Sequence, residues 1–229
     1  MDDSSVLGSI PIVDFGAYSL EKESPDPERL QKLVDEVHRA LTTIGFLYLK
    51  NTGCPANVVI KNVFEKSKVF FDLDKKEKSK YRRGDIIADS NFGYIELEQE
   101  GLNPERRKDL KEAFNYEPAE TEKIPNELAG KPKLNDMMEA LRTFFEYGKS
   151  IHDRLLEIIA KGLNFEDTQY FVKRHKSIGE ENNVTMVRSL YYPPIRNKDV
   201  KKNQIRCGEH VDYGCVALLI QNNEGLEVR

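Results

Sequence analysis

The hydrophobic pattern of the chain changes its period near Asn183, and this change constrains the fold more than any other feature of the sequence. Before it, residues 134–165 place apolar side chains at helical spacing over the longest periodic stretch of the chain. After it, residues 184–192 alternate with a period of two, which is typical of a strand. The sequence therefore predicts an α+β protein in which a mainly helical N-terminal region precedes a sheet.

Shorter elements are predicted on both sides of the long helix. Residues 10–15 and 46–50 have the composition of brief strands, and residues 28–46 show helical spacing. A further helix is expected to begin at Pro55, and another short one to cover 166–175.

Two charged or irregular stretches are harder to assign. The stretch 84–133 carries scattered glycines and prolines, so we expect mostly loop there. Within it, residues 107–118 could turn apolar side chains toward a core, as a strand or as one or two helical turns. The basic run 75–83 contains an internal glutamate, and we interpret it as a solvated helix face and turn.

Three further strands are expected near the C-terminus, at 204–212, 215–221 and 226–229. Every residue from Cys215 to Ile220 is apolar, as in a strand buried inside a two-sheet sandwich.

Composition limits the partners that the chain can have. The 229 residues carry 35 basic and 39 acidic side chains, a net charge of −4, so there is no electrostatic reason to expect nucleic acid. Three cysteines without framework spacing favour a reducing compartment, and we expect a cytoplasmic protein. No apolar run approaches the roughly 20 residues needed to cross a bilayer, so we expect no membrane contact.

His210 and Asp212 are the candidate metal ligands. Residues two apart in an extended segment project to the same side, so an imidazole nitrogen and a carboxylate oxygen would meet at one point. One carboxylate with two histidines is the ligand set of non-haem Fe(II) oxygenases. A pair of this kind near a turn can also be an ordinary surface pair.

The motifs around this pair resemble those of the isopenicillin N synthase-like family of Fe(II)/2-oxoglutarate-dependent oxygenases. The similarity extends over almost the whole chain and is sharpest at its end, where His-x-Asp-Tyr-Gly, an apolar run and Gly-Leu-Glu-Val follow one another. The matching segments are residues 10–15, 45–53, 70–81, 93–98, 109–116, 190–194 and 208–229.

The resemblance implies a helical region packed on a double-stranded β-helix, the jelly roll, which is incomplete here. It implies an N-terminal oxygenase-family region at 9–130, the long helix and a following helix at 131–182, and the start of the roll at 183–229.

The resemblance also implies the chemistry. Fe(II) is the expected metal and 2-oxoglutarate the cosubstrate, with ascorbate as a supporting reductant, dioxygen as co-reactant and a small organic molecule as substrate. It makes His210 and Asp212 metal ligands, and it makes Tyr192 a cosubstrate-binding residue. As an alternative, Tyr192 is a strand tyrosine packed in the roll.

Two of the family's binding elements have no counterpart in this sequence. Only 17 residues follow Asp212 (229 − 212), and they include neither a histidine nor the Arg-x-Ser pair that holds the far carboxylate of 2-oxoglutarate. Upstream, His38, His152 and His175 lie in predicted helices, where we expect surface or packed side chains. We therefore expect a C-terminally truncated oxygenase whose own activity is uncertain, unstable alone because sheet edges and apolar faces lack cover.

Two other functions are compatible with the same residues. One is a non-catalytic binding or regulatory remnant of such an enzyme. The other is a cupin-like metal protein, which would need further ligands that the sequence does not offer.

Overall fold

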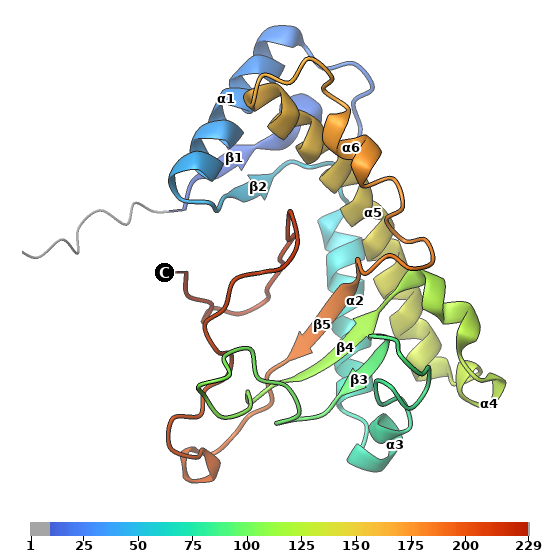
Figure 1. The fold of residues 1–229 in the computed structure, drawn as a ribbon. Coiled ribbons are helices and arrows are strands. Elements are labelled where there is room, and N and C mark those ends of the chain that lie inside the picture. The colour runs from blue at the N-terminus through green and yellow to red at the C-terminus, as the bar shows by residue number, and fades with distance from the viewer. Residues whose placement is uncertain (1–9, 229) are drawn as a thin grey trace, which may run out of the picture. The chain divides into compact units, whose positions relative to one another are not determined.

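A computed structural model describes residues 10–228 of the chain (Figure 1). The chain divides into two compact units whose segments alternate along the sequence. One takes its described residues from Met1–Pro55 and Tyr147–Lys176, and the other from Ala56–Glu146 and Ser177–Arg229. The outer ends of the predicted regions 9–130 and 183–229 lie outside the described residues, and the boundaries between the three regions stay predictions.

The first unit is built on a small parallel sheet. Strands β1 (Ile12–Asp14) and β2 (Tyr48–Lys50) pair in the register that sets Val13 opposite Leu49. Their positions confirm the two short strands predicted from composition.

Helix α1 (Pro27–Thr43) packs beside this sheet. Asp26 caps it by accepting a hydrogen bond from the backbone N–H of Arg29, and a proline follows the cap, where its missing N–H costs nothing. The remaining elements of this unit are η1 (Phe15–Tyr18), α6 (Tyr170–Arg174) and the second half of α5 (Pro132–Gly162).

Helix α5 confirms the strongest sequence prediction. It has 31 residues, which at ~1.5 Å per residue makes it about 46 Å long. The division between the units falls within this helix, so each unit contains a different stretch of it.

The second unit holds an antiparallel sheet in the order β3 (Gly93–Ile95), β4 (Glu112–Tyr116), β5 (Val187–Tyr191). In the central strand, Phe114 lies opposite Tyr94 on one side and Ser189 on the other. The segment 107–118 is thus a strand, which resolves the alternative that the sequence left open. The other elements of this unit are α2 (Ala56–Phe71), α3 (Lys75–Ser79), η2 (Pro118–Lys123), α4 (Asn126–Ala129) and η3 (Asn197–Asp199).

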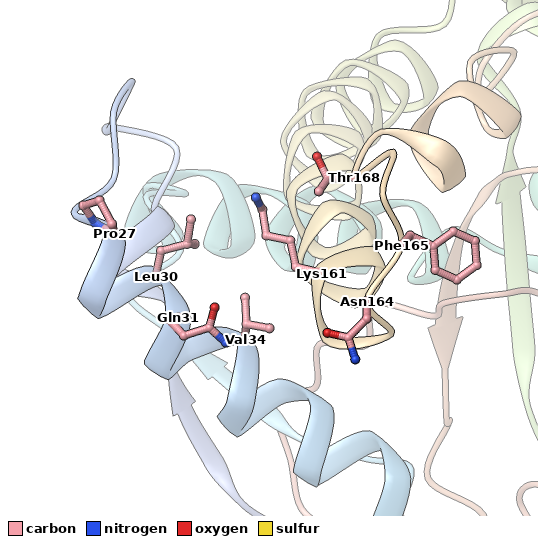
Figure 2. A pocket seen from close by; sticks show the side chains of 8 residues that line it. All are labelled: Pro27, Leu30, Gln31, Val34, Lys161, Asn164, Phe165 and Thr168. Carbon is pink, nitrogen blue, oxygen red and sulfur yellow. The ribbon is translucent and has the colours of Figure 1, made fainter.

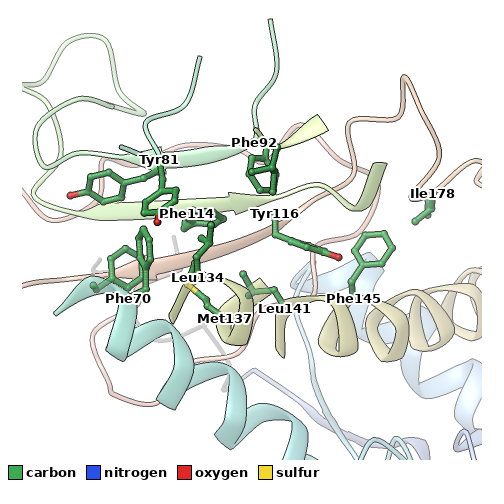
Figure 3. Close-up of a cluster of buried hydrophobic side chains, with 13 residues drawn as sticks. Phe70, Tyr81, Phe92, Phe114, Tyr116, Leu134, Met137, Leu141, Phe145 and Ile178 are labelled. Carbon is green, nitrogen blue, oxygen red and sulfur yellow. The ribbon is translucent and has the colours of Figure 1, made fainter. Parts of the chain in front are cut away.

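An aromatic core joins this sheet to α2 and α5 (Figure 3). The ring centroids of Phe70 and Phe114 are 5.1 Å apart, those of Phe92 and Phe114 are 5.5 Å apart, and both pairs meet edge to face. Met137 and Leu141 of α5 are fully buried against the same cluster. Every residue of β4 is buried, which is why this strand does not show the alternation of a half-exposed one.

The stretch 84–133 is mostly loop, as predicted, with β4 inside the segment 107–118 and the three-residue β3 as an unpredicted strand. The basic run 75–83 forms helix α3 and a turn, as predicted, but the prediction that it is solvated is wrong at Lys78. This side chain is buried, and its Nζ lies 2.6 Å from Glu112 Oε2. Hydropathy could not reveal this burial, because the partner carboxylate comes from a strand 34 residues away.

The three strands predicted at 204–212, 215–221 and 226–229 are also not formed within the described residues, and Arg229 lies outside them. A strand exists only where a neighbouring strand accepts and donates its backbone hydrogen bonds. The described part of 204–229 makes one such bond to another segment, from Leu110 N–H to Ile205 O at 3.0 Å. Leu219 and Ile220, expected inside a sandwich, are exposed.

The observed architecture is therefore a mixture of helices and small open sheets, as the α+β prediction requires. Among the described residues, no helix combines the length and apolar composition that crossing a bilayer requires.

Candidate metal site

The two candidate metal ligands lie side by side in the second unit. His210 Nε2 is 3.4 Å from Asp212 Oδ1, and the imidazole is about one-third exposed. The segment has no regular secondary structure, yet the i and i+2 side chains still meet there.

The other ring nitrogen of His210 is held by the backbone. Nδ1 lies 2.9 Å from the carbonyl oxygen of Gly208. With its proton on Nδ1, the ring donates to this carbonyl, and the Nε2 lone pair is then available on the side of Asp212. A backbone carbonyl on one nitrogen is the usual device that orients a metal-binding histidine. The donor set therefore fits a metal ion such as Fe(II) through one nitrogen and one carboxylate oxygen.

The described residues do not complete a three-residue ligand set. No group of three or more histidine, cysteine, aspartate or glutamate side chains within 10–228 is arranged to hold a metal. The other histidines lie in the first unit, and they are surface or packed side chains, as the sequence predicted. His38 is exposed on α1, whereas His152 is half-buried with its ring centroid 5.3 Å from that of His175.

Contacts with the residues before β4 hold the segment that carries His210. The N–H of Gly208 donates to Asp109 Oδ1 at 3.1 Å. Arg106 donates two hydrogen bonds to Glu209, one to each carboxylate oxygen, both at 2.8 Å. These contacts hold the two residues that directly precede His210.

A second anchor lies a few residues earlier in the same segment. The amide of Gln204 donates to Glu98 Oε1 at 2.6 Å and to the carbonyl of Lys108 at 2.9 Å. Lys201 also reaches Glu98, at 2.9 Å from both carboxylate oxygens. The hydrogen bonds from Gln204 and Lys201 lower the pKa of Glu98.

Tyr192, the candidate cosubstrate-binding residue, follows β5 and is 43% exposed. Partial burial of the phenol, together with the charge and hydrogen bonding of Cys207, raises its pKa to about 12. The phenol thus keeps its proton at any working pH and is able to donate a hydrogen bond. Cys207 precedes Gly208, so Tyr192 neighbours the segment that carries His210.

A charged network beside Tyr192 was not foreseen from the sequence. Arg188 of β5 donates to both oxygens of Glu100, at 2.8 and 3.1 Å, and to the side-chain oxygen of the fully buried Asn115 at 3.0 Å. Burial raises the pKa of Glu100, but Arg188 and Arg83 lower it by more, so the net shift is downward. The signal that could have revealed this network is the alternation of glutamates at positions 96, 98 and 100 before a buried strand.

The first unit contains an open hollow of about 420 Å³ that none of the candidate site residues lines (Figure 2). Its lining residues are Pro27, Leu30, Gln31, Val34, Lys161, Asn164, Phe165 and Thr168. The charged group in this lining, Lys161, is paired with Glu157 at 3.6 Å, and the hollow offers no cluster of titratable groups for chemistry.

The chain is similar to known proteins of one family. The family model described as "non-haem dioxygenase in morphine synthesis N-terminal" matches residues 10–132. The 2-oxoglutarate-dependent dioxygenase tropC of Talaromyces stipitatus is 30% identical over 96% of this chain and 69% of its own length. The 2-oxoglutarate-dependent dioxygenase htyE of Aspergillus rugulosus is 25% identical over 95% of this chain and 65% of its own length.

A solved structure shows the same relationship. A full-length Neurospora crassa protein, crystallised with alpha-KG and 5-formyluracil, superimposes with a TM-score of 0.65 at 26% identity. The alignment covers 90% of this chain and 60% of that protein. The chain belongs to the family of 2-oxoglutarate-dependent non-haem dioxygenases, and the resemblance stated from the motifs is confirmed. It spans about two-thirds of the length of the two relatives named above.

Proposed function

We propose that this chain carries part of the active site of an Fe(II)/2-oxoglutarate-dependent oxygenase, which hydroxylates or otherwise oxidises a small organic molecule. His210 and Asp212 are two of its iron ligands, and Tyr192 binds the cosubstrate. The observation that carries the proposal is the His210 ring, whose Nδ1 faces the carbonyl of Gly208 while Nε2 faces Asp212. The family supplies the metal and the cosubstrate, as the names of the relatives indicate.

The chain's own residues have distinct tasks in this proposal. Bound iron and 2-oxoglutarate supply the activation of dioxygen. His210 donates its Nε2 lone pair and Asp212 supplies the anionic oxygen, while the Gly208 carbonyl keeps the ring in the metal-binding tautomer. The protonated Tyr192 phenol donates a hydrogen bond to a cosubstrate carboxylate.

We also propose that residues 183–228 begin the family's jelly roll, with β5 as its first formed strand. Support comes from the likeness to the Neurospora crassa structure. That protein was crystallised with a pyrimidine, 5-formyluracil, and other relatives are named as dioxygenases or as a proline hydroxylase, which supports a small organic substrate. The cytoplasm is the proposed location, because the sequence carries three cysteines without framework spacing.

Metal titration tests the proposed site without depending on turnover. Co(II), a redox-stable substitute for Fe(II), is added to the purified chain, and binding is followed by calorimetry and by the visible absorption of the bound ion. His210→Ala and Asp212→Ala are each expected to weaken binding at least tenfold, since each removes one of two donors. His38→Ala, an exposed histidine on α1, is the matched control and is expected to bind as the parent does.

A turnover assay separates the oxygenase from the alternative, a non-catalytic remnant. The chain is incubated with Fe(II), 2-oxoglutarate and ascorbate, and succinate is measured. Succinate that disappears in His210→Ala supports the oxygenase. Co(II) binding that His210→Ala leaves unchanged contradicts the assignment of the metal site.

A further inference from the structure

A buried carboxylate lies behind the candidate metal site. Asp109 is 1% exposed and directly precedes Leu110 at the entrance to β4. One of its oxygens, Oδ1, accepts the N–H of Gly208 at 3.1 Å. The other, Oδ2, lies 2.9 Å from Lys111 Nζ and 3.4 Å from the N–H of Leu102. One side chain thus joins three backbone segments that are up to 106 residues apart.

The Gly208 contact continues to the histidine. Gly208 is held at its N–H by Asp109 and at its carbonyl by His210 Nδ1, so a short chain of hydrogen bonds runs from the buried carboxylate to the imidazole. The position also fits glycine closely, because a Cβ there would lie 3.0 Å from both the backbone nitrogen and the Cβ of Asn103. A side chain at this position would displace Gly208, and with it the carbonyl that faces His210 Nδ1.

We infer that Asp109 is a positioning residue for the His210–Asp212 pair. It holds Gly208 in place, and Gly208 in turn presents His210 with Nε2 toward the metal. A hydrogen bond to a carboxylate is stronger than one between neutral groups, and a dry surrounding strengthens it further. Lys111 is also buried, at 3% exposed, and it is the counter-ion of the Asp109 carboxylate. The charge of this carboxylate is therefore balanced inside the protein. The inference rests on the proposed function insofar as it takes the pair to bind the metal.

A purely structural role for Asp109 makes a different prediction, and the chain provides a matched control. Glu112 is another buried carboxylate paired with a lysine, Lys78, in the same unit, and its carboxylate contacts Lys78 and Tyr94 rather than residues 204–212. If Asp109 only stabilised the unit, Asp109→Ala and Glu112→Gln would have similar effects on the His210 segment.

The experiment measures backbone exchange and metal binding in the same variants. Hydrogen exchange of the segment 205–214 is followed by mass spectrometry in the absence of metal. In Asp109→Ala, the Gly208 amide is expected to exchange on the order of tenfold faster, since a hydrogen bond to a charged group is lost. The Co(II) dissociation constant is expected to rise about tenfold in Asp109→Ala. Glu112→Gln is expected to leave both quantities near the parental values.

A second variant covers the case in which Asp109→Ala does not fold. Asp109→Asn combined with Lys111→Met keeps an oxygen for Gly208 and removes both buried charges. It is expected to retain parental exchange in 205–214 and parental Co(II) affinity. Exchange that is unchanged in Asp109→Ala, or raised equally in Glu112→Gln, overturns the inference.

The two proposals can fail separately. If His210→Ala leaves Co(II) binding unchanged, the metal assignment fails, whereas the exchange rate of Gly208 still decides whether Asp109 holds the segment. If His210→Ala abolishes binding but Asp109→Ala changes neither exchange nor affinity, the metal site stands and the positioning role fails.

Discussion

Lys78 Nζ lies 2.6 Å from Glu112 Oε2, and both side chains are about nine-tenths buried. The hydroxyl of Tyr94 donates to the same oxygen at 2.5 Å, and Lys78 also donates to the carbonyl of Phe71 at 2.9 Å. A lysine of the short helix α3 thus neutralises a carboxylate that is buried in the sheet of the second unit.

Lys78→Met is expected to lower the free energy of unfolding by about 3 kcal/mol, because it leaves the buried carboxylate of Glu112 without its counter-ion. Urea unfolding followed by circular dichroism measures this change. The double variant Lys78→Met with Glu112→Leu is expected to recover part of the loss, since it removes both charges. Lys61→Met, which removes an exposed pair with Glu65 on α2, is the control, and the expected loss is below ~1 kcal/mol. Equal losses at the two lysines would contradict the prediction.

Gly93→Ala is expected to cost about 3 kcal/mol or more. Gly93 begins β3 at φ +119°, and a Cβ there would lie 2.7 Å from the carbonyl oxygen of Tyr81. Thermal and urea unfolding measure the loss. Gly84→Ala is the matched control, because φ is +84° but no atom lies within 4 Å of its Cβ, so about 1–2 kcal/mol is expected. A loss at Gly93 no larger than that at Gly84 would show that the close approach is relieved.

His152 is expected to make stability depend on pH near neutrality. Burial lowers its pKa, against the opposing effect of Asp153. Below the unfolded pKa of about 6.5, the unfolded chain therefore takes up a proton more readily than the folded one, and stability falls as the pH falls through this range. The midpoint of urea unfolding at pH 7.5 and 5.5 measures the effect.

His152→Gln is expected to reduce this pH dependence, because it removes the titrating ring. His38→Gln, at an exposed position on α1, serves as the control and is expected to keep the parental dependence. A parental slope in His152→Gln would assign the pH dependence to other groups.

Tyr192→Phe is expected to weaken binding of 2-oxoglutarate about threefold to tenfold while the fold is retained, since one hydrogen bond is lost. Calorimetric titration with 2-oxoglutarate in the presence of Co(II) measures the change. Tyr48→Phe, at an exposed tyrosine of β2, is the control. If Tyr192→Phe binds as the parent does, the assignment of Tyr192 as a cosubstrate-binding residue fails.

The elements that sequence analysis predicted correctly are those whose signal is local. The helical spacing of residues 134–165 and of residues 28–46 lies within the helices that it specifies. The failures share a cause as well. The strands expected at 204–212 and 215–221 depend on partner strands, and no period in the sequence can supply a partner.

The candidate site divides in the same way. The sequence alone determined that His210 and Asp212 can share one point, because residues two apart in an extended segment project to the same side. Only the tertiary structure decided what holds them there. Asp109 lies 99 residues before Gly208, and its burial next to Lys111 arises from the entrance to β4 meeting the His210 segment. Hydrogen bonds between distant segments depend on how the chain packs, so they cannot be deduced from spacing.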